Sequence, residues 1–377
     1  MDDLGTIGDD IAKEVIKQFE TNDLKGKPVI RSNGVKEWTV LAGVVALKNG
    51  KVINTISIAT GVKALPDATI KSHSNGLLLH DCHAEILAFR AFNWFVIQEC
   101  LKVSNLDRSD YFEFNDGHFN LKDGIEFGMY VSEPPCGDAS LELLIDENDE
   151  EWRTHTELAG GVLRGRENYT LKGRVRTKPG RRDSPMTLSK SCSDKLAVKQ
   201  FTSILNGVTS SFVHPKGCYL KYLVIPEDKV DMPAMERCFH DRFNPHPINH
   251  MYTLNRLKIL TTKETHSFAK EQSNQPPSNT SLIYVPKYNF NESIVNSVKE
   301  GYYTKRKSVR KNGESELSRY KLFQESQSLS GGFKARSYFE WKLTNKEYRK
   351  AKEIAKEAIG AWCCTATDDF DILKNDA

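Results

Sequence analysis

The stretch Asp81-Cys82-His83-Ala84-Glu85-Ile86 places a carboxylate two residues after a potential metal ligand. Two later stretches, Pro135-Cys136-Gly137 and Ser191-Cys192-Ser193-Asp194-Lys195, each add a Cys. One His and two Cys can hold zinc in three of its four tetrahedral positions, and a catalytic site keeps the fourth position open for water. Glu85 is close enough to exchange protons with that water without binding the metal. The chain is therefore predicted to form a catalytic zinc site, with the ligands His83, Cys136 and Cys192.

These residues are informative only as a set. The H-x-E triplet alone is a weak signal, and any one of the three ligands is better interpreted as a buried thiol or a core histidine. Together they match the H-x-E and P-C signature of zinc-dependent nucleobase deaminases. The chain departs from that signature at Ala139, which stands where a second Cys of P-C-x-x-C is expected. The third ligand must come from elsewhere, and Cys192 is the best-placed candidate.

The composition is that of a globular protein with enough apolar residues for a sizeable core. Hydrophobic residues make up 39% of the 377 positions and charged residues 27%, with a net charge of only +3. Basic residues nevertheless cluster, since eleven Lys or Arg stand against three acids between Arg164 and Lys199, and a second basic stretch runs from Lys305 to Lys321. Such clusters suit nucleic acid or a multiply phosphorylated small molecule. A solvated basic surface explains either stretch alone equally well.

The cysteines and the N-terminus indicate a cell compartment. Eight Cys occur without the regular spacing of a disulfide framework, the opening MDDLGTIGDD is not an apolar signal, and no apolar run approaches membrane-spanning length. We therefore expect an intracellular protein with no membrane partner, in the cytoplasm or the nucleus. The basic residues at 305–307 and 310–311 are compatible with an import signal, although a solvated patch is the better interpretation.

The first part of the chain alternates between strand and helix patterns. Residues 9–20 have helical spacing, and residues 38–47 and 52–58 form strand-like runs around Asn49-Gly50, the strongest short-range hairpin signal. A helix is expected over 83–103, a buried strand over 127–131 and a short helix over 136–145. This order predicts an α/β layered core in which two helix starts bring the ligands to one edge of a sheet. The positive end of a helix dipole also favours thiolate over thiol.

The second part is less regular. Residues 149–190 are rich in Arg, Lys, Gly and Ser and predict a long loop. A helix is expected over 192–205, stopped by Asn206-Gly207, followed by a strand over 217–225. Residues 271–281 read as a surface loop, and residues 341–359 as one clear helix.

Together with Arg176-Thr177-Lys178 and Gly360-Ala361-Trp362, the three quoted stretches resemble the adenosine-to-inosine RNA deaminases. The resemblance extends from about residue 38 to about residue 370, and the absence of a double-stranded-RNA-binding module favours the branch that acts on tRNA. It implies that His83, Cys136 and Cys192 bind one zinc ion and that Glu85 is the proton shuttle. The implied reaction is hydrolytic deamination of adenosine to inosine, at position 37 beside the anticodon of tRNA-Ala, with no DNA partner.

The resemblance also implies a fold and a domain organisation. The expected architecture is α/β: a cytidine-deaminase-like three-layer core, with a central mixed sheet between helices on both faces. A helical C-terminal extension would enclose a polyphosphate. Residues 1–377 would then form a single deaminase domain, with the zinc-site core at about 38–225 and the part at about 226–377 completing the polyphosphate site.

Members of the family bury one inositol hexakisphosphate, and this chain has basic and aromatic residues at the matching positions: Arg90, Lys195, Tyr338, Lys342, Tyr348, Lys352 and Trp362. A buried polyanion requires many such donors, because unpaired buried charge is strongly unfavourable. Other positions depart from the family, namely His80, Phe89, Val198-Lys199 and Cys363-Cys364-Thr365. Replacement donors are expected among Lys199, Arg319 and Lys321, or binding is weaker.

Substrate contacts are expected from residues near the metal motif: Lys63, Lys178, Arg181 and Arg182. In the family's RNA-acting enzymes, a Glu in the loop after Arg-Thr-Lys fills the space left by the flipped base. Here that loop is shorter and basic, running from Pro179 to Asp183. A single-stranded loop leaves no orphan base to replace, so Arg181 and Arg182 are interpreted as contacts to the RNA backbone.

Three alternatives remain open at this point. A deaminase of free nucleosides would need a small closed pocket and no basic stretches. A non-catalytic zinc and RNA-binding module would close the metal with a fourth protein ligand, for which Cys82 is the candidate. Cytosine as the target base is separated from adenine only by the stretch around Cys192 and by the family resemblance.

Overall fold

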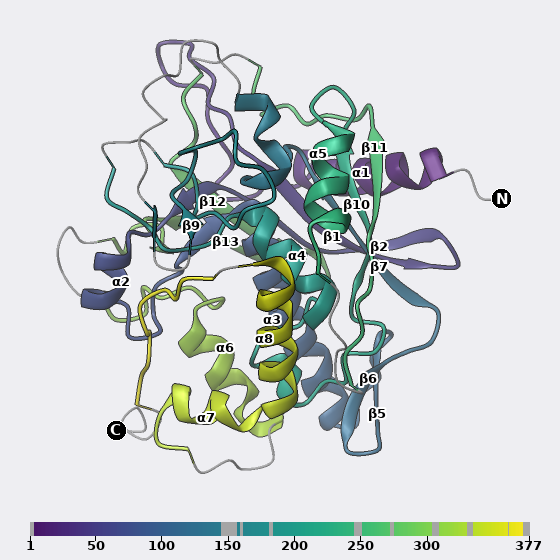
Figure 1. Cartoon of the computed structure of the whole chain (residues 1–377). Coiled ribbons are helices and arrows are strands. Elements are labelled where there is room, and N and C mark those ends of the chain that lie inside the picture. The colour runs from purple at the N-terminus through teal and green to yellow at the C-terminus, as the bar shows by residue number, and fades with distance from the viewer. Residues whose placement is uncertain are drawn as a thin grey trace.

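An eight-stranded mixed sheet forms the centre of the protein, with strand order β11-β10-β7-β1-β2-β12-β13-β14 (Figure 1). The computed structural model describes residues 4–144, 157–158, 161–180, 184–244, 251–271, 275–303, 309–329, 335–360 and 362–371. The sheet strands are β1 Leu41–Lys48, β2 Lys51–Thr60, β7 Ile125–Val131, β10 Leu220–Pro226, β11 Lys258–Thr262, β12 Thr280–Val285, β13 Phe290–Val295 and β14 Val298–Lys299. Three short ladders join β3 Val62–Ala64 to β4 Asp81–His83, β5 Phe112–Asn115 to β6 His118–Leu121, and β8 Glu157–Leu158 to β9 Val162–Leu163.

The α-helices of the described segments surround this sheet, and α1 and α3 pack directly on it. They are α1 Leu4–Thr21, α2 Asp67–His73, α3 Ala84–Ser104, α4 Cys192–Thr202, α5 Met232–Glu236, α6 Arg319–Ser326, α7 Tyr338–Thr344 and α8 Lys346–Ile359. Helix α1 covers one face, where Val15 and Phe19 pack with Leu41 and Val45 of β1. Helix α3 covers the other face, against Ala42, Val44 and Ala46. The alternation along β1 therefore sends side chains into two apolar layers, with α8 packed beside α4 (Figure 1).

The predicted hairpin is confirmed. Asn49 and Gly50 have φ values of 53° and 75°, as the two-residue turn that suits twisted antiparallel strands requires. β1 is antiparallel to both β2 and β7, with Leu41 opposite Thr60 and Ala42 opposite Val131. The carboxyl ends of β2 and β7 therefore meet at one edge of the sheet. The chain leaves that edge toward His83 on one side and toward Cys136 on the other.

The predicted helix over 136–145 is wrong. The described residues form two short 3-10 turns, Asp138–Ser140 and Glu142–Leu144. Tertiary contacts here take the place of helical hydrogen bonds. The Asp138 carboxylate accepts from the N–H of Gly173 at 2.6 Å and forms an ion pair with Arg237.

The single helix predicted over 341–359 is two helices. Asn345 separates α7 from α8 with φ −79° and ψ 73°, and its side chain caps α8 by accepting from the N–H of Tyr348 at 3.1 Å. Two further predicted ends shift: α4 stops at Thr202, before a Ser203 with φ 60°, and β10 begins at Leu220. The predicted helices at 9–20 and 83–103 and the strand at 127–131 are confirmed.

The predicted long loop at 149–190 is only partly a surface feature. Residues 145–156, 159–160 and 181–183 lie outside the described part of the structure, but Arg176, Thr177 and Lys178 are almost completely buried. This basic stretch therefore belongs to the interior beside the predicted metal ligands. Within the described segments, no helix combines the length and the apolar character needed to cross a bilayer.

Candidate active site

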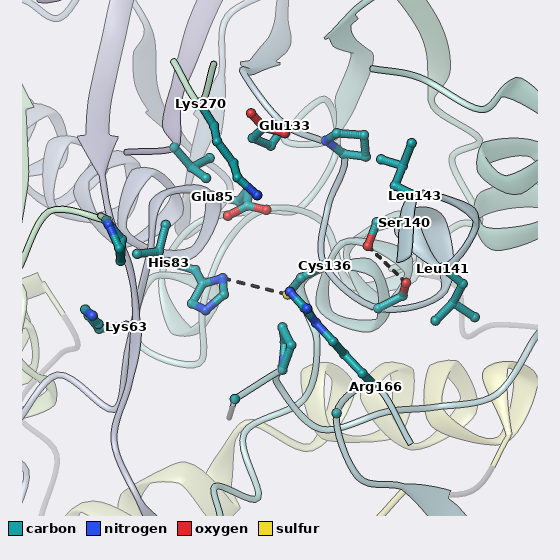
Figure 2. A pocket seen from close by; sticks show the side chains of 18 of the residues that line it. Lys63, His83, Glu85, Glu133, Cys136, Ser140, Leu141, Leu143, Arg166 and Lys270 are labelled. Carbon is teal, nitrogen blue, oxygen red and sulfur yellow. Dashed lines mark hydrogen bonds between the residues drawn. The ribbon is translucent and has the colours of Figure 1, made fainter. Parts of the chain in front are cut away.

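His83, Cys136 and Cys192 converge as the sequence predicts. The Nδ1 atom of His83 lies 3.7 Å from the Sγ atom of Cys136 (Figure 2) and 3.7 Å from the Sγ atom of Cys192. All three ligand atoms lie within 4.8 Å of one another. Tetrahedral zinc, with bonds of about 2.3 Å to sulfur and about 2.0 Å to nitrogen, places such atoms about 3.5 Å apart. This group can therefore hold a zinc ion.

Three different local structures present these ligands. His83 ends β4 and is the N-cap residue of α3, whereas Cys192 opens α4 behind the N-cap Ser191. Cys136 lies in the turn after β7, followed by Gly137 with φ 107°. A Cβ at Gly137 would lie 2.3 Å from the Oγ of Ser191, so only glycine allows this turn to approach α4. Two helix starts do meet at the site, but they belong to His83 and Cys192 rather than to His83 and Cys136.

Hydrogen bonds fasten the two cysteine segments together. The backbone N–H of Cys192 donates to the Sγ of Cys136 at 3.3 Å, and the N–H of Ser193 donates to the Cys136 carbonyl at 3.0 Å. A hydrogen bond from Cys192 holds the pKa of Cys136 well below its usual value, and the charge of Lys178 adds to this against the effect of burial. Cys136 is thus prepared to bind a metal as thiolate, whereas burial and the neighbouring Cys136 raise the pKa of Cys192 well above its usual value.

Lys178 was expected to contact substrate, but its contacts in the structure are with the ligands. Its side chain is fully buried, and its amine lies 2.8 Å from the Sγ of Cys192 and 3.4 Å from Oδ2 of Asp81. Burial alone would lower the pKa of Lys178, but the charges of Asp81 and the two thiols raise it well above its usual value. Lys178 is therefore a fixed cation that offsets thiolate charge.

Asp81 connects this cation to a second one. Its Oδ2 atom also accepts from the amine of Lys195, which in turn donates to Ser189 Oγ at 2.7 Å. Burial acts to raise the pKa of Asp81, but Lys178 and Lys195 outweigh that effect and hold it far below its usual value. Since Lys195 is three residues beyond Cys192, α4 joins the metal group to the cavity described below.

Glu85 lies in the first turn of α3, and its side chain lines the same cavity as His83 and Cys136 (Figure 2). The cavity has a volume of about 560 Å³. Burial raises the pKa of Glu85, although the charge of Lys178 partly opposes this. The carboxyl group can therefore accept and retain a proton beside the metal ligands, as a shuttle must.

Cationic side chains stand on the cavity wall. The predicted contact Lys63 is exposed at β3, whereas Arg181 and Arg182 lie outside the described residues. Arg166 was not predicted individually: its side chain reaches toward Cys136 and has no hydrogen bond or ion pair among the described residues (Figure 2). Only the fold identifies it, because eleven basic residues share its stretch of sequence.

The loop that carries Arg166 is held from inside by Arg176, whose side chain is buried. Its guanidinium donates to the carbonyls of Gly165, Glu167, Asn168 and Leu171 at 2.5–3.3 Å. The Arg176 N–H is itself fixed to Asp194 Oδ2 at 3.0 Å, and Asp194 forms an ion pair with Arg242. A guanidinium suits this role because its planar fork can satisfy several carbonyls at once.

A second cavity, of about 430 Å³, lies on the far side of Lys195. It is lined by six Lys or Arg and one Asp: Lys190, Lys195, Arg319, Lys342, Lys352, Lys356 and Asp368. Burial and the neighbouring cations lower the pKa of Lys352 to about 7 and that of Lys342 to about 8. Such mutual repulsion is relieved by an anion of high charge.

Most of the predicted phosphate-site residues reach this cavity. Lys195, Tyr338, Lys342, Lys352 and Trp362 line it, and Tyr348 lines an adjoining hollow with Lys342 and Lys352. Arg90 does not line it, because its guanidinium donates to the carbonyl of Leu317.

Among the suggested replacements, Arg319 lines the cavity, whereas Lys321 pairs with Glu314 at 3.7 Å and does not. The amine of Lys199 donates to the carbonyl of Leu205, and its charge contributes to the lowered pKa of Lys352. Lys190 and Lys356 were missed. Both lie near the ring of Trp362, with amine-to-centroid distances of 5.6 and 5.9 Å.

A comparison with family models matches residues 57–366 to the adenosine-deaminase (editase) domain. The chain belongs to the adenosine-deaminase (editase) family. The match includes all three ligands and Glu85, and it covers most of the chain. Membership identifies the protein as a hydrolytic deaminase, which agrees with a proton-accepting carboxyl beside a group that can hold zinc.

Members of the editase family from yeasts are similar over nearly their full length. The protein named tRNA-specific adenosine deaminase 1 of Saccharomyces cerevisiae is 35% identical over 96% of this chain and 94% of its own length. Its namesake in Schizosaccharomyces pombe is 36% identical over 98% of both chains. The double-stranded RNA-specific editase B2 of Rattus norvegicus is 30% identical over 56% of this chain and 30% of its own length.

The editase site leaves one metal position without a protein ligand among the described residues. Cys82, the candidate fourth ligand, is not part of the ligand group. Its buried thiol lies 3.9 Å from both the Leu79 carbonyl and the Ser297 hydroxyl. The described residues therefore form an open zinc site rather than a closed structural one, with a position left for water.

Proposed function

We propose that this protein deaminates adenosine to inosine in tRNA, with position 37 of tRNA-Ala as the specific target. The observation that carries the proposal is the placement of Glu85 with the ligands His83 and Cys136 on the wall of one cavity. The cationic side chains on that wall form no ion pair with the residues that the structure describes. The names of the two yeast relatives, similar along almost the whole chain, support tRNA as the substrate.

The residues divide the chemistry as follows. Zinc, held by His83, Cys136 and Cys192, would supply a Lewis acid that lowers the pKa of a bound water. Glu85 takes a proton from the attacking water and delivers it to a ring nitrogen of adenine, where inosine keeps it. Glu85 then passes a second proton, from the new C6 hydroxyl, to the amino group, which leaves as ammonia. Lys178 holds the thiols in place and offsets their charge throughout.

The substrate backbone is bound by Lys63 and Arg166 on the cavity wall, and we retain Arg181 and Arg182 as further contacts. An adenine can reach Glu85 only if it leaves its stack, which is easiest for an unpaired nucleotide. An anticodon loop supplies such a nucleotide together with phosphates on both sides. A free nucleoside brings no phosphate for these cations, so RNA is the better substrate class.

The second cavity is proposed to hold one inositol hexakisphosphate as a structural cofactor. The cavity wall carries six Lys or Arg and one Asp, and an anion of high negative charge would neutralise this excess of positive charge. In this proposal the helical C-terminal part, about 226–377, completes the site beside a cytidine-deaminase-like core of about 38–225. Residues 1–377 then act as one deaminase domain, inside the cell.

Purified zinc-loaded protein and unmodified tRNA-Ala transcript provide the test. The wild type is expected to form inosine at position 37, whereas Glu85→Gln should lower kcat by about 10²–10⁴-fold with its zinc content unchanged. A Glu113→Gln variant, on exposed strand β5 away from the cavity, is the matched control. Folded, zinc-loaded wild type that converts free adenosine but not tRNA-Ala would overturn the substrate assignment.

A further inference from the structure

Trp38 and Lys270 form a pair at the catalytic cavity that has no part in holding the metal. Both line the cavity that contains Glu85, and the Lys270 amine lies 5.4 Å from the centre of the indole ring. Trp38 is half-buried and Lys270 is exposed. Figure 2 shows the Lys270 side chain extending into the space above Glu85.

The indole is held in one position. The backbone N–H of Trp38 donates to the Pro276 carbonyl at 3.0 Å, and the N–H of Ser278 donates to the Trp38 carbonyl at 2.8 Å. The ring Nε1–H donates to the Gln275 carbonyl at 2.8 Å. With its polar atom satisfied and its backbone paired, the ring is a rigid apolar surface, and a rigid aromatic residue loses little entropy when a ligand stacks on it.

Lys270 is available to a ligand. Apart from the indole, its amine makes no hydrogen bond or ion pair among the described residues. Glu133, an acid on the same cavity wall, pairs with Lys229. A flexible exposed cation beside a fixed aromatic ring is the combination that proteins use to bind single-stranded nucleic acid, with the ring taking a base and the cation a phosphate.

We propose that Trp38 stacks on the nucleotide next to the target adenosine, while Lys270 binds a phosphate of that nucleotide. This inference rests on the proposed function, because it requires an RNA substrate. When the target base leaves its stack, its neighbour loses a stacking partner, and the indole replaces it. Stacking tolerates any base, so the pair selects for an unpaired neighbour rather than for a sequence.

The test compares Trp38→Leu and Trp38→Phe on an anticodon stem-loop, either intact or abasic at the 5′ or the 3′ neighbour. Trp38→Leu is expected to lower kcat/KM on intact RNA by about 10- to 100-fold, whereas Trp38→Phe retains most activity. For the wild type, kcat/KM should fall by a similar factor on one of the two abasic RNAs relative to intact RNA. For Trp38→Leu, kcat/KM should be the same on that abasic RNA as on intact RNA. The stacking role would be overturned if Trp38→Leu lowered kcat/KM by the same factor on intact and on abasic RNA, or did not lower it at all.

Lys270→Gln should raise KM and reduce the salt dependence of binding by roughly 0.7 in the log–log slope, as one lost phosphate contact predicts. Lys263→Gln is the control, since that exposed lysine pairs with Glu227 at 3.8 Å and does not line the cavity. If the log–log slope of Lys270→Gln equals that of the wild type, Lys270 does not bind a phosphate.

Fluorescence separates this inference from the proposed function. In a Glu85→Gln background, RNA binding should quench part of the tryptophan emission, and Trp38→Phe should remove that part while binding persists. Binding without a Trp38-dependent change would overturn the inference even if the enzyme edits tRNA. Absence of inosine in every RNA would instead contradict the proposed function.

Discussion

The amine of Lys178 lies 2.8 Å from the Sγ of Cys192, with its side chain wholly removed from solvent. A buried cation beside two thiols lowers the free energy of their deprotonated forms, which are the forms that bind metal. The Asp81 carboxylate, 3.4 Å from the same amine, supplies a negative charge that pairs with this buried cation. The charged groups around the metal ligands are therefore already in place in the folded protein.

Replacing Lys178 by Met should therefore weaken zinc binding by about 10- to 100-fold, the range seen when a supporting partner of metal ligands is removed. Competition with a chromogenic chelator measures this directly. Lys172→Met, in the same segment but with an exposed amine that pairs with Glu142, is the control. Unchanged zinc affinity in Lys178→Met would show that the amine does not act through the thiols.

Arg176→Lys keeps the charge but loses the fork that satisfies four carbonyls of the 165–171 segment. Leaving buried carbonyls unpaired should reduce the free energy of unfolding by about 2–4 kcal/mol. Urea denaturation measures the loss, and limited proteolysis should show cleavage within 161–171. The exposed Arg174, changed to Lys, should leave both measurements as in the wild type.

Arg166→Gln should raise KM for the RNA substrate about tenfold with little change in kcat, because a phosphate contact contributes equally to bound substrate and transition state. Steady-state kinetics on tRNA test this, with Arg174→Gln as the matched exposed arginine. A fall in kcat at constant KM would place Arg166 in the chemical step instead.

The lowered pKa values of Lys352, about 7, and Lys342, about 8, make polyanion binding depend on pH. A bound polyanion favours the charged amines, so binding takes up protons and should weaken as pH rises from 7 to 9. Calorimetry in buffers of different ionisation enthalpy measures that uptake. Protein stripped of the anion should show the opposite trend: because the unfolded chain keeps its lysines protonated up to about pH 10, its Tm should rise with pH between 7 and 10.

Local patterns predicted much of this molecule. Asn49-Gly50 dictated its own turn, helix α3 followed from its apolar spacing, and the three ligands were identified because few chemical roles require their combination. The turn and helix signals are each contained in neighbouring residues, whereas the ligand signal combines three separate stretches. Patterns of that kind survive folding because tertiary contacts reinforce them rather than compete with them.

The break between α7 and α8 is local, at Asn345, but other predictions that differed depended on partners distant in sequence. The segment after Cys136 gives up a helix because Asp138 is taken by Gly173 and Arg237. Nothing in the local sequence of Lys178 indicates that it is buried, whereas Lys172 in the same segment is exposed. Lys190, just before α4, and Lys356, in α8, belong to the second cavity only because these two segments meet there, with the Trp362 ring near both amines.

The pairing of β2 with β12 has a consequence for the growing chain. Ile58 and Ala59 hydrogen-bond with a strand more than two hundred residues later, so β2 is an exposed sheet edge until residues 280–285 have left the ribosome. An unpaired apolar edge is a site of intermolecular association. Truncated chains that end before β12 should therefore aggregate, and correct synthesis should benefit from a chaperone that shields that edge while the second half is translated.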